Sequence, residues 1–299
     1  MDAFDGLLPV SVRTERMLPL SRYSSFLIGG AAKRAVFPKN REELLLTLRA
    51  VKDCQERYLL IGKGSNVVFS DEGFDGTVIF TTDCKQTVRT ERGFLVDAGA
   101  SLASVAVAAR DASLGGMEFA HGIPGTLGGA VYMNAGAFGG ELSQICVSSD
   151  YFDMDTGEIC TLRGAEHAWG YRKSFYSEHP RAVILSAFLE LFDRDACLIR
   201  ETMKEYSDRR RSTQPIEYPS AGSVFKRPTG QYAGKLIEDC GLKGYTVGGA
   251  QVSEKHAGFI VNRGEATAED VKRLVGKIQK TVFERFGVEL MCELRFLDA

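Results

Sequence analysis

Residues His121–Leu142 read HGIPGTLGGAVYMNAGAFGGEL, with glycine at positions 122, 125, 128, 129, 136, 139 and 140. Glycine accepts positive φ angles and lets the backbone come close to a ligand, so its N–H groups can surround a pyrophosphate. A flexible linker is the alternative, but linkers are polar, whereas this stretch carries Ile123, Val131 and Phe138. We therefore predict a packed phosphate-binding loop.

A second glycine cluster, IGKGSNV at 61–67, directly follows an apolar run. Backbone N–H groups at the end of a buried strand can form a concave anion site, so this cluster is a second candidate for phosphate contact. It is not a Rossmann fingerprint, because GxGxxG would require glycine where the chain has Val67, and the sequence contains no Walker A motif. A plain tight turn is the alternative that these residues leave open.

The segments around these clusters predict an α/β opening third. Residues 40–53 (NREELLLTLRAVKD) predict a helix, with Asn40 as N-cap and Glu43 as its capping-box partner. Short apolar runs at 58–70 and 76–81 suit buried strands, and the Ala- and Val-rich stretch 101–112 predicts a further helix behind a serine cap.

The chain changes character after residue 145. The stretch 145–163 resembles a hairpin that turns at Asp155-Thr156-Gly157, and RAVILSAFLELF at 181–192 is a strongly apolar strand, so a mainly antiparallel unit is expected. A charged helix that ends before Pro215 then leads into the last region, and we place a domain boundary near residue 195.

The final hundred residues predict two helices and two strands. The helices lie at about 231–240 and 267–284, and Thr267 and Asp270 predict a capping box at the start of the second. Strands are expected at GFIVN (258–262) and ELMCELRFL (289–297).

Length and composition are those of a globular enzyme large enough to hold a cofactor. The 299 residues exceed what one hydrophobic core usually serves, so two or three lobes are expected. The formal net charge of −2, with scattered basic residues, shows no footprint for a polyanion, so we expect no nucleic-acid partner. The triplet Arg209-Arg210-Arg211 suits one or two phosphates or, equally, a solvated helix face.

Cysteine usage and hydropathy indicate the compartment. The seven cysteines are dispersed, with no CxxC pair, which predicts a reducing environment. The N-terminal sequence lacks the apolar core of a signal peptide, and nowhere do about 18 uncharged apolar residues run together. We therefore expect a cytoplasmic protein with no membrane association. Without HExxH or a spaced His/Cys set, no metal site is predicted.

Six segments, taken together and in order, carry a family resemblance over nearly the whole chain. They are FLIGGAA (26–32), LLIGKGSNVV (59–68), GIPGTLGGAVYMNAGAFGGE (122–141), YRKSFY (171–176), PSAGSVFKRP (219–228) and AGKLIEDCGLKGYTVGGAQVSEKHAGFIVN (233–262). The set resembles the signature of the UDP-N-acetylenolpyruvoylglucosamine reductase family. Residues 195–299 leave no room for the tyrosine loop of the family's longer form, so the chain resembles the shorter form.

The resemblance implies an α+β chain with an FAD-binding fold of the vanillyl-alcohol-oxidase type, built from two α/β lobes. The FAD-binding domain is then residues 1–195, split near residue 80, and an α+β substrate-binding domain is 196–299, with a last strand that returns to the FAD domain as an open alternative. By the same resemblance, the FAD pyrophosphate lies against Gly62, Gly64, Ser65, Asn66, Gly122, Ile123, Pro124, Gly125, Asn134 and Gly136.

The resemblance also implies a reaction, the NADPH-driven reduction of UDP-N-acetylglucosamine enolpyruvate to UDP-N-acetylmuramate through non-covalently bound FAD. This step supplies peptidoglycan precursors, and so serves cell-wall biogenesis, cell shape and cell division. Arg172 matches the family arginine at the substrate carboxylate, Ser223 the proton-donating serine and Glu293 the acid that stabilises the intermediate. Without the resemblance, an isolated arginine is usually a surface charge, an isolated serine a turn residue and an isolated glutamate in a terminal strand an exposed edge charge.

The expected partner is the UDP-sugar, with no obligatory protein partner. Basic residues in or beside the matched segments could neutralise its diphosphate, and two polar residues lie in or beside VSEKH. For the histidine, His256, a structural role is as well supported as a contact with the ligand. The candidates are Arg209, Lys226, Lys235, Gln251, Lys255 and His256.

Two rival functions belong to other classes. One is a flavin oxidase of the same superfamily that acts on an alcohol or sugar, with His121 as the only histidine near a glycine loop for covalent attachment. The other is a non-catalytic sensor of UDP-sugars or nucleotides. The joint presence of Arg172, Ser223 and Glu293 argues against the sensor, because a sensor needs no proton donor.

Overall fold

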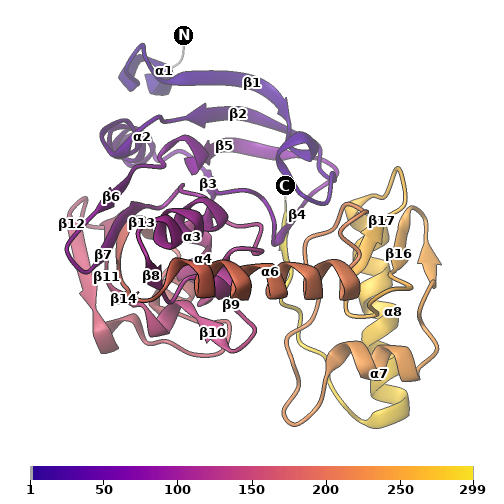
Figure 1. Ribbon diagram of the computed structural model, residues 1–299. Coiled ribbons are helices and arrows are strands. Elements are labelled where there is room, and N and C mark those ends of the chain that lie inside the picture. Colours follow the sequence, from indigo (N-terminus) through magenta and orange to yellow (C-terminus); the bar gives the residue numbers. More distant parts are fainter. Residues whose placement is uncertain (1–2, 299) are drawn as a thin grey trace. The chain divides into compact units, whose positions relative to one another are not determined.

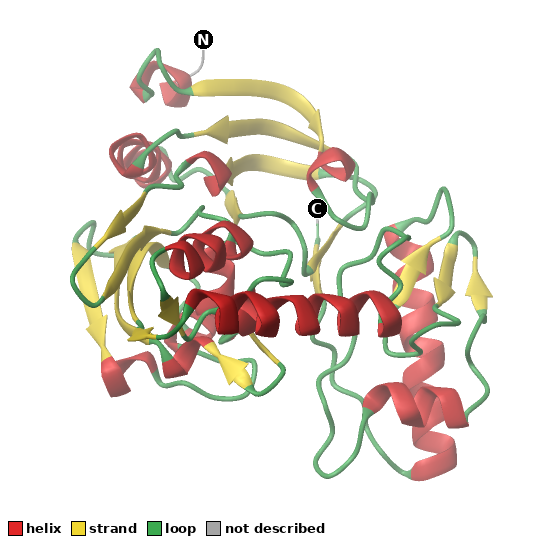
Figure 2. Ribbon diagram, viewed as in Figure 1, coloured by secondary structure: helices red, strands yellow, loops and turns green. Residues whose placement is uncertain are grey.

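The computed structural model describes residues 3–298 and contains two compact units, each with its own helices and strands (Figures 1 and 2). The first unit consists of Met1–Arg16, Arg34–Lys63 and Gly76–Asp208, and the second of Met17–Lys33, Gly64–Asp75 and Arg209–Ala299. The second unit therefore combines three stretches that are far apart in the sequence. Helices and strands alternate along the chain, which confirms the predicted mixed fold class.

A four-stranded sheet near the start of the chain has the order β1-β2-β5-β3 (Figure 1). β3 and β5 are parallel, with Tyr58 opposite Thr77, so the second glycine cluster begins at the carboxyl end of a parallel strand. The strands are β1 (Arg13–Pro19), β2 (Ala31–Phe37), β3 (Tyr58–Ile61) and β5 (Phe74–Phe80).

Helix α2 (Arg41–Asp53) begins where the sequence predicts, because the Asn40 side chain accepts a hydrogen bond from the Glu43 N–H (2.9 Å). The predicted capping box is wrong. The Glu43 carboxylate accepts instead from the backbone N–H of Lys39 (2.8 Å) and from the Ser11 hydroxyl (2.8 Å). A tertiary partner 32 residues away thus redirects this side chain.

Helix α3 (Leu102–Asp111) is also present as predicted, but its serine cap is not. Ser101 stands at the N-cap position without capping the helix, and its hydroxyl accepts a hydrogen bond from Lys63 Nζ (2.8 Å). The lysine of the second glycine cluster is thereby held at the start of this helix.

A five-stranded antiparallel sheet has the order β12-β11-β13-β7-β6 and confirms the predicted antiparallel unit. The predicted hairpin is β11–β12, with Phe152 opposite Ile159 across the Asp155-Thr156-Gly157 turn. The strands are β6 (Thr87–Arg89), β7 (Gly93–Asp97), β11 (Cys146–Asp153), β12 (Ile159–Arg163) and β13 (Ala182–Glu190).

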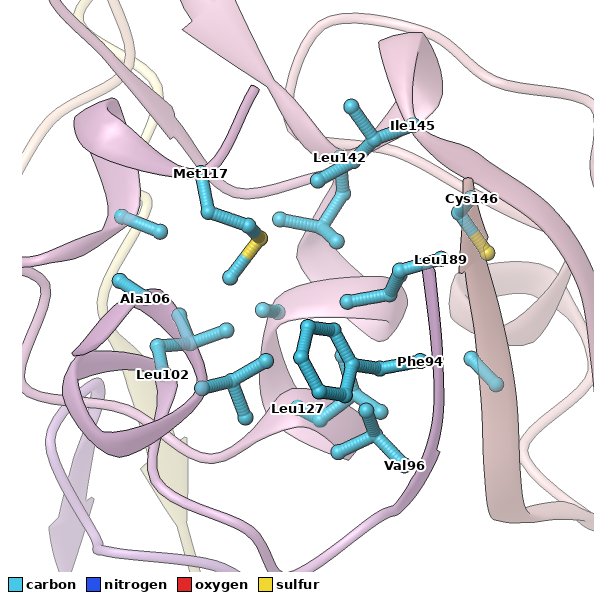
Figure 3. Close-up of a cluster of buried hydrophobic side chains, with 14 of the residues drawn as sticks. Phe94, Val96, Leu102, Ala106, Met117, Leu127, Leu142, Ile145, Cys146 and Leu189 are labelled. Atoms are coloured by element: carbon cyan, nitrogen blue, oxygen red, sulfur yellow. The ribbon is translucent and has the colours of Figure 1, made fainter. Parts of the chain in front are cut away.

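The main core of the first unit packs α3 and α4 (Leu127–Met133) against this sheet (Figure 3). Phe94 and Leu189 of the strands point toward Leu102 of α3 and Leu127 of α4. Leu127 lies within the glycine-rich segment, and burying a leucine contributes roughly 1.5–3 kcal/mol. The segment is therefore a packed element, as predicted, and not a linker.

The remaining elements of this part of the chain are short, apart from helix α6, which ends before Pro215 as predicted. They are α1 (Ala3–Leu7), η2 (Thr81–Asp83), β8 (Leu114–Gly115), η3 (Glu118–Ala120), β9 (Gly136–Ala137), β10 (Gly140–Glu141), η4 (Leu142–Gln144), η5 (Gly164–His167), α5 (Phe175–Glu178), β14 (Phe192–Asp193) and α6 (Ala196–Thr213).

The second unit packs α7 and α8 beside a three-stranded antiparallel sheet, β15-β16-β17. Thr267 and Asp270 form the predicted capping box of α8. Of the predicted strand 289–297, only β18 is regular, and it pairs in parallel with β4. The elements are η1 (Leu20–Tyr23), β4 (Val67–Phe69), α7 (Ala233–Asp239), β15 (Thr246–Val247), β16 (Ala250–Val252), β17 (Ile260–Asn262), α8 (Ala268–Phe286) and β18 (Arg295–Leu297).

None of the helices within residues 3–298 combines the length and apolarity needed to span a membrane.

Candidate active site

The end of β3 meets the start of α4 inside the first unit. Gly62 follows β3 directly, and a Cβ atom at this position would lie 2.3 Å from Thr126 Oγ1. Thr126 caps α4, because its hydroxyl accepts a hydrogen bond from the Gly129 N–H (3.4 Å). Any side chain at position 62 would push the two segments apart, which explains the glycine. The two glycine clusters of the sequence are therefore neighbours here.

Residues Gly64, Ser65 and Asn66 form a turn in the second unit, directly before strand β4. Gly64 has a φ of +59°, and an added Cβ would lie 2.2 Å from the Tyr23 carbonyl oxygen. Within residues 3–298, no hydrogen bond is donated by the backbone N–H of these three residues. Successive unpaired N–H groups in a turn are a typical site for an anion, so this turn suits a phosphate group.

The loop His121–Gly125 is fixed by its own backbone. The Ile123 N–H donates to the Ala120 carbonyl (3.0 Å), and the Gly125 N–H donates to the Ile123 carbonyl (2.9 Å). Beside them, Nδ1 of His121 is buried and has no hydrogen-bond partner in the part of the chain that the structure describes. Burial lowers the pKa of His121, so the ring is neutral at pH 7. A bound ligand could satisfy this polar atom.

Asn134 ends α4 in the left-handed conformation (φ +42°), and its side chain binds the protein itself. The amide nitrogen donates to Glu141 Oε1 (3.1 Å) and to the Gly170 carbonyl (3.1 Å), and Oδ1 accepts from the Ser143 N–H (2.9 Å). These bonds give Asn134 a supporting role, and its contact with a cofactor stays a prediction. Sequence reasoning missed both partners, because no local spacing signals a contact across 7 residues to Glu141 or across 36 residues to Gly170.

Arg172 lies in a tight turn of the first unit. Gly170 and Lys173 exchange two backbone hydrogen bonds (3.0 and 3.1 Å) around it, and Arg172 has a φ of +54°. Its Nη2 donates to the carbonyl of Gly136 (3.1 Å), a predicted FAD contact. Arg172 is thus tied to the glycine-rich segment. Strained residues of this kind cluster at functional sites.

Ser223 and Glu293 lie on adjacent backbone segments of the second unit. The Glu293 N–H donates to the carbonyl of Val224 (2.8 Å), and Ser223 pairs with Phe259 in an isolated bridge. Asn66 Nδ2 donates to the Glu293 carbonyl (3.2 Å). This unit therefore brings together two of the predicted catalytic residues and one predicted FAD contact.

Among the substrate candidates, His256 is linked to this group. Its Nδ1 accepts a hydrogen bond from the Gly258 N–H (3.1 Å), and the Gly258 carbonyl accepts from the Val224 N–H (2.9 Å). Burial lowers the pKa of His256, so its neutral ring keeps Nδ1 as an acceptor. The ring thereby supports the backbone next to Ser223.

Two of the lysine candidates have protein partners in the second unit. Lys235 is exposed on α7 and pairs with Asp239 (2.6 Å), which raises the pKa of the lysine. Lys255 Nζ donates to the Arg211 carbonyl (2.6 Å) and lies 3.6 Å from a Glu217 carboxylate oxygen. A diphosphate would compete with these partners.

The last three substrate candidates differ in the contacts that they make with the rest of the protein. Gln251 Nε2 donates to the carbonyl of Gly244 (3.1 Å) and to the Thr246 hydroxyl (3.1 Å), so its side chain stabilises a loop. Lys226 is half-buried and uses its backbone N–H to pair with Met291 (2.8 Å), whereas Arg209 is exposed on α6. Their contacts with substrate stay predictions.

Known proteins match both parts of this architecture. A family model described as FAD binding domain matches residues 32–163, and one described as UDP-N-acetylenolpyruvoylglucosamine reductase, C-terminal domain, matches 214–297. The UDP-N-acetylenolpyruvoylglucosamine reductase of Caldicellulosiruptor bescii is 44% identical over 280 residues, which cover 93% of this chain and 89% of the relative. The chain belongs to the UDP-N-acetylenolpyruvoylglucosamine reductase family.

Other members of the reductase family agree in sequence and in fold. The Lachnoclostridium phytofermentans reductase is 44% identical over 294 residues, 96% of this chain and 94% of its own. The crystal structure of the Thermus caldophilus reductase is 34% identical, with a TM-score of 0.80, and covers 95% of this chain and 99% of that chain. These matches confirm the α+β class and the FAD-binding fold of the vanillyl-alcohol-oxidase type.

The residues of this family member suit the FAD that its fold implies. In the first unit, Gly62 leaves no space for a Cβ, and Nδ1 of His121 is a buried polar atom with no hydrogen-bond partner among residues 3–298. In the second unit, Gly64 leaves no space for a Cβ, and the turn of Gly64, Ser65 and Asn66 has backbone N–H groups that donate to no group of the described residues. A cofactor with a diphosphate and polar ring atoms can satisfy each of these kinds of group.

Proposed function

We propose that this chain catalyses the FAD-dependent, NADPH-driven reduction of UDP-N-acetylglucosamine enolpyruvate to UDP-N-acetylmuramate. The observation that carries the proposal is the family match over nearly the whole chain, 44% identical to a reductase across 93% of its length. The strained conformation of Arg172 and the unpaired donors of the Gly64–Asn66 turn support it independently. The product serves peptidoglycan precursor synthesis, and hence cell shape and division, in the cytoplasm.

In this proposal, residues 1–195 hold FAD and residues 196–299 bind the substrate. The FAD diphosphate is assigned to the turn of Gly64, Ser65 and Asn66, whose backbone N–H groups donate to no group within residues 3–298. Contacts of Gly122 and Gly125 with FAD stay predictions of the family resemblance. When bound, FAD would supply the hydride chemistry that links NADPH to the vinyl carbon C3 of the substrate. The chain's own residues must then manage the charge and the proton at the neighbouring carbon, C2.

Arg172 provides the positive charge at the substrate carboxylate. Addition of hydride at C3 leaves an enolate-like C2, whose negative charge spreads onto the carboxylate oxygens. A guanidinium can donate two parallel hydrogen bonds to such a pair of oxygens. This interaction is strongest when the negative charge is fully developed, so it stabilises the intermediate more than the bound substrate. The bond from Arg172 Nη2 to the Gly136 carbonyl fixes the orientation of its planar fork beforehand.

Ser223 and Glu293 complete the reaction from the second unit. The Ser223 hydroxyl is exposed and donates the proton that C2 receives. Glu293 stabilises the intermediate, which requires that its carboxyl is protonated or shares a proton. The bond between Glu293 and Val224 keeps both groups on neighbouring backbone segments.

Binding of the UDP moiety is assigned to polar residues of the second unit. Lys226 is the half-buried basic candidate, and Arg209 is an exposed one. Lys235 and Lys255 would exchange their present partners for diphosphate oxygens. Gln251 and His256 support the surrounding backbone through their hydrogen bonds.

The deciding experiment measures NADPH oxidation by the purified protein with and without the enolpyruvyl UDP-sugar. We expect oxidation that depends on this substrate and a product with a lactyl ether. Oxidation that does not change when the substrate is added contradicts the proposal. Denaturation of the yellow protein should release free FAD, whereas colour retained on the chain would indicate covalent attachment and the rival oxidase function.

A further inference from the structure

The Arg172 turn is a conformation that needs support. In the Gly170–Lys173 turn, Arg172 occupies the third position with a φ of +54°, where glycine or asparagine is normally found. An arginine there is sterically unfavourable and persists only if the surroundings hold it. The residues that flank the segment 168–175, which carries this turn, are therefore candidates for such support.

A buried hydroxyl joins the two ends of that segment. Ser149 on β11 lies 2.8 Å from Nε2 of His167, which directly precedes the segment, and 2.6 Å from the phenol oxygen of Tyr176, which directly follows it. All three side chains are at most 1% exposed. We name these three residues the Ser149 hub.

The hydrogens of the Ser149 hub have one consistent arrangement. His167 Nδ1 lies 3.1 Å from the carbonyl of Gly164, which only accepts, so Nδ1 carries the ring proton. Nε2 of the neutral ring is then an acceptor for the Ser149 hydroxyl. That oxygen accepts in turn from Tyr176. Burial lowers the pKa of His167 and raises that of Tyr176, which agrees with a neutral hub.

Other contacts hold the same segment to the Ser149 hub and to the glycine-rich region. At the hub, the Trp169 ring stacks on the His167 ring, with ring centroids 4.7 Å apart and planes 8° apart. The Gly170 carbonyl accepts from Asn134, and the buried Ser174 hydroxyl donates to the Tyr132 carbonyl (2.8 Å). The segment is thus held along its length, and the Ser149 hydroxyl connects the residues at its two ends through a single atom.

We propose that the Ser149 hydroxyl, acting through His167 and Tyr176, is a positioning group that holds Arg172 in its strained turn. The inference rests on the proposed function of Arg172. Ser149 itself is not a catalytic residue, because its side chain is buried on strand β11 and acts only through the segment.

The test separates the two halves of the reaction by stopped flow. In Ser149→Ala, we expect the enolpyruvyl substrate to reoxidise the reduced flavin about 10- to 100-fold more slowly, as a small displacement of a catalytic group does. Flavin reduction by NADPH and FAD content should equal those of the wild type. Tyr176→Phe, which removes one oxygen, should show the same pattern and carries the test if Ser149→Ala fails to fold. Ser149→Thr, which keeps the hydroxyl, should restore most of the rate.

Ser186→Ala is the matched control. Ser186 is a buried serine on β13 of the same sheet, paired with Asp150 next to Ser149, but its hydroxyl accepts a hydrogen bond from Arg41 Nη1 (3.0 Å), which is not a residue of the Ser149 hub. The control should leave reoxidation unchanged. If Ser186→Ala slows reoxidation as much as Ser149→Ala, the effect is a general loss of sheet stability and the inference is wrong.

A double-mutant cycle tests whether the effect passes through Arg172. Once Arg172→Ala has removed the guanidinium, adding Ser149→Ala should slow reoxidation by less than about twofold, because the positioned group is gone. If the loss of rate in the double variant equals the product of the losses in the two single variants, the inference is wrong.

Hydrogen exchange provides a readout that does not depend on activity. The amides of segment 168–175 should exchange faster in Ser149→Ala than in the wild type, and not in Ser186→Ala. If the wild type shows no substrate-dependent reoxidation, the proposed function fails, and the exchange rates still decide whether the Ser149 hub holds the turn. Unchanged exchange in Ser149→Ala and Tyr176→Phe overturns the inference.

Discussion

The predicted catalytic residues of the two units are held in place by different means. Arg172 occupies a strained turn whose supports are side chains, including Asn134 and the Ser149 hub. Ser223 and Glu293 are placed mainly by backbone bonds, through Val224 and the bridge to Phe259. Side-chain supports can be removed by one substitution, whereas backbone pairing survives most substitutions. Distant mutations should therefore disturb Arg172 more readily than the serine and the glutamate.

The largest expected effect removes the proton donor itself. In Ser223→Ala, reoxidation by the enolpyruvyl substrate should slow by ~10²–10⁴, the range associated with general acid catalysis. Its position depends on backbone pairing, so the fold and the reduction of FAD by NADPH should stay normal. Ser223→Cys keeps a donor of similar size and should lose less. Stopped-flow traces of both half-reactions measure this, and normal reoxidation in Ser223→Ala would remove the serine from the mechanism.

The next largest effect is expected from removing the charged groups, Arg172 in the first unit and Glu293 in the second. Arg172→Ala and Glu293→Gln should each lower kcat by about 10²–10³ with little change in KM, because both groups act on charge that develops during the reaction. Steady-state kinetics at saturating NADPH checks this. A rise in KM with normal kcat would make either residue a binding group.

The third prediction concerns the turn at Gly64. Gly64→Ala combines an unfavourable φ of +59° with a Cβ 2.2 Å from the Tyr23 carbonyl, so FAD affinity should fall at least about tenfold. Gly230→Ala is the control, because Gly230 has a similar φ of +71° but open space around an added Cβ. Fluorescence titration of the apoprotein with FAD measures both. Equal affinities in the two variants would show that the Gly64 turn is not part of the cofactor site.

Local signals in the sequence predicted the elements that local contacts determine. The capping box of Thr267 and Asp270 and the cap by Asn40 involve residues three positions apart, and the structure contains both. The Asp155-Thr156-Gly157 hairpin is equally local. These features depend on backbone groups that neighbouring side chains must satisfy, so a short sequence window is sufficient to predict them.

The predictions that failed involve partners from distant parts of the chain. Glu43 binds Ser11 and Lys39, and Ser101 binds Lys63, so neither side chain does what the local pattern suggests. The Ser149 hub joins β11 to residues 18 and 27 positions later, and no periodicity marks such a meeting. The candidate site residues were therefore predicted from the resemblance of the six segments to a known family. Local patterns could not predict them, because the arrangement of these residues depends on tertiary structure.

The smallest expected effect concerns the acid stability of the second unit. The pKa of His256 is lowered by burial, so below about pH 6.5 the unfolded chain binds a proton that the folded chain resists. Stability should fall as the pH drops from 6.5 toward the lowered pKa, by at most about 1.4 kcal/mol per pH unit. His256→Asn can keep an acceptor for the Gly258 N–H without titrating, so its stability should fall less. Denaturant unfolding at pH 5.0 and 7.5 compares the two proteins, and identical losses would exclude His256 as the cause.

The parallel pairing of β4 with β18 imposes an order on synthesis and folding. β4 leaves the ribosome early, yet its partner lies more than 220 residues later, and Asp71 beyond β4 accepts hydrogen bonds from the first N–H groups of α8 (2.8 and 3.2 Å). The nascent chain must therefore hold β4 and Asp71 without these partners until nearly the whole protein has been made. A chain interrupted before Arg295 would leave one side of β4 exposed, and such a strand edge is what chaperones and aggregating chains bind.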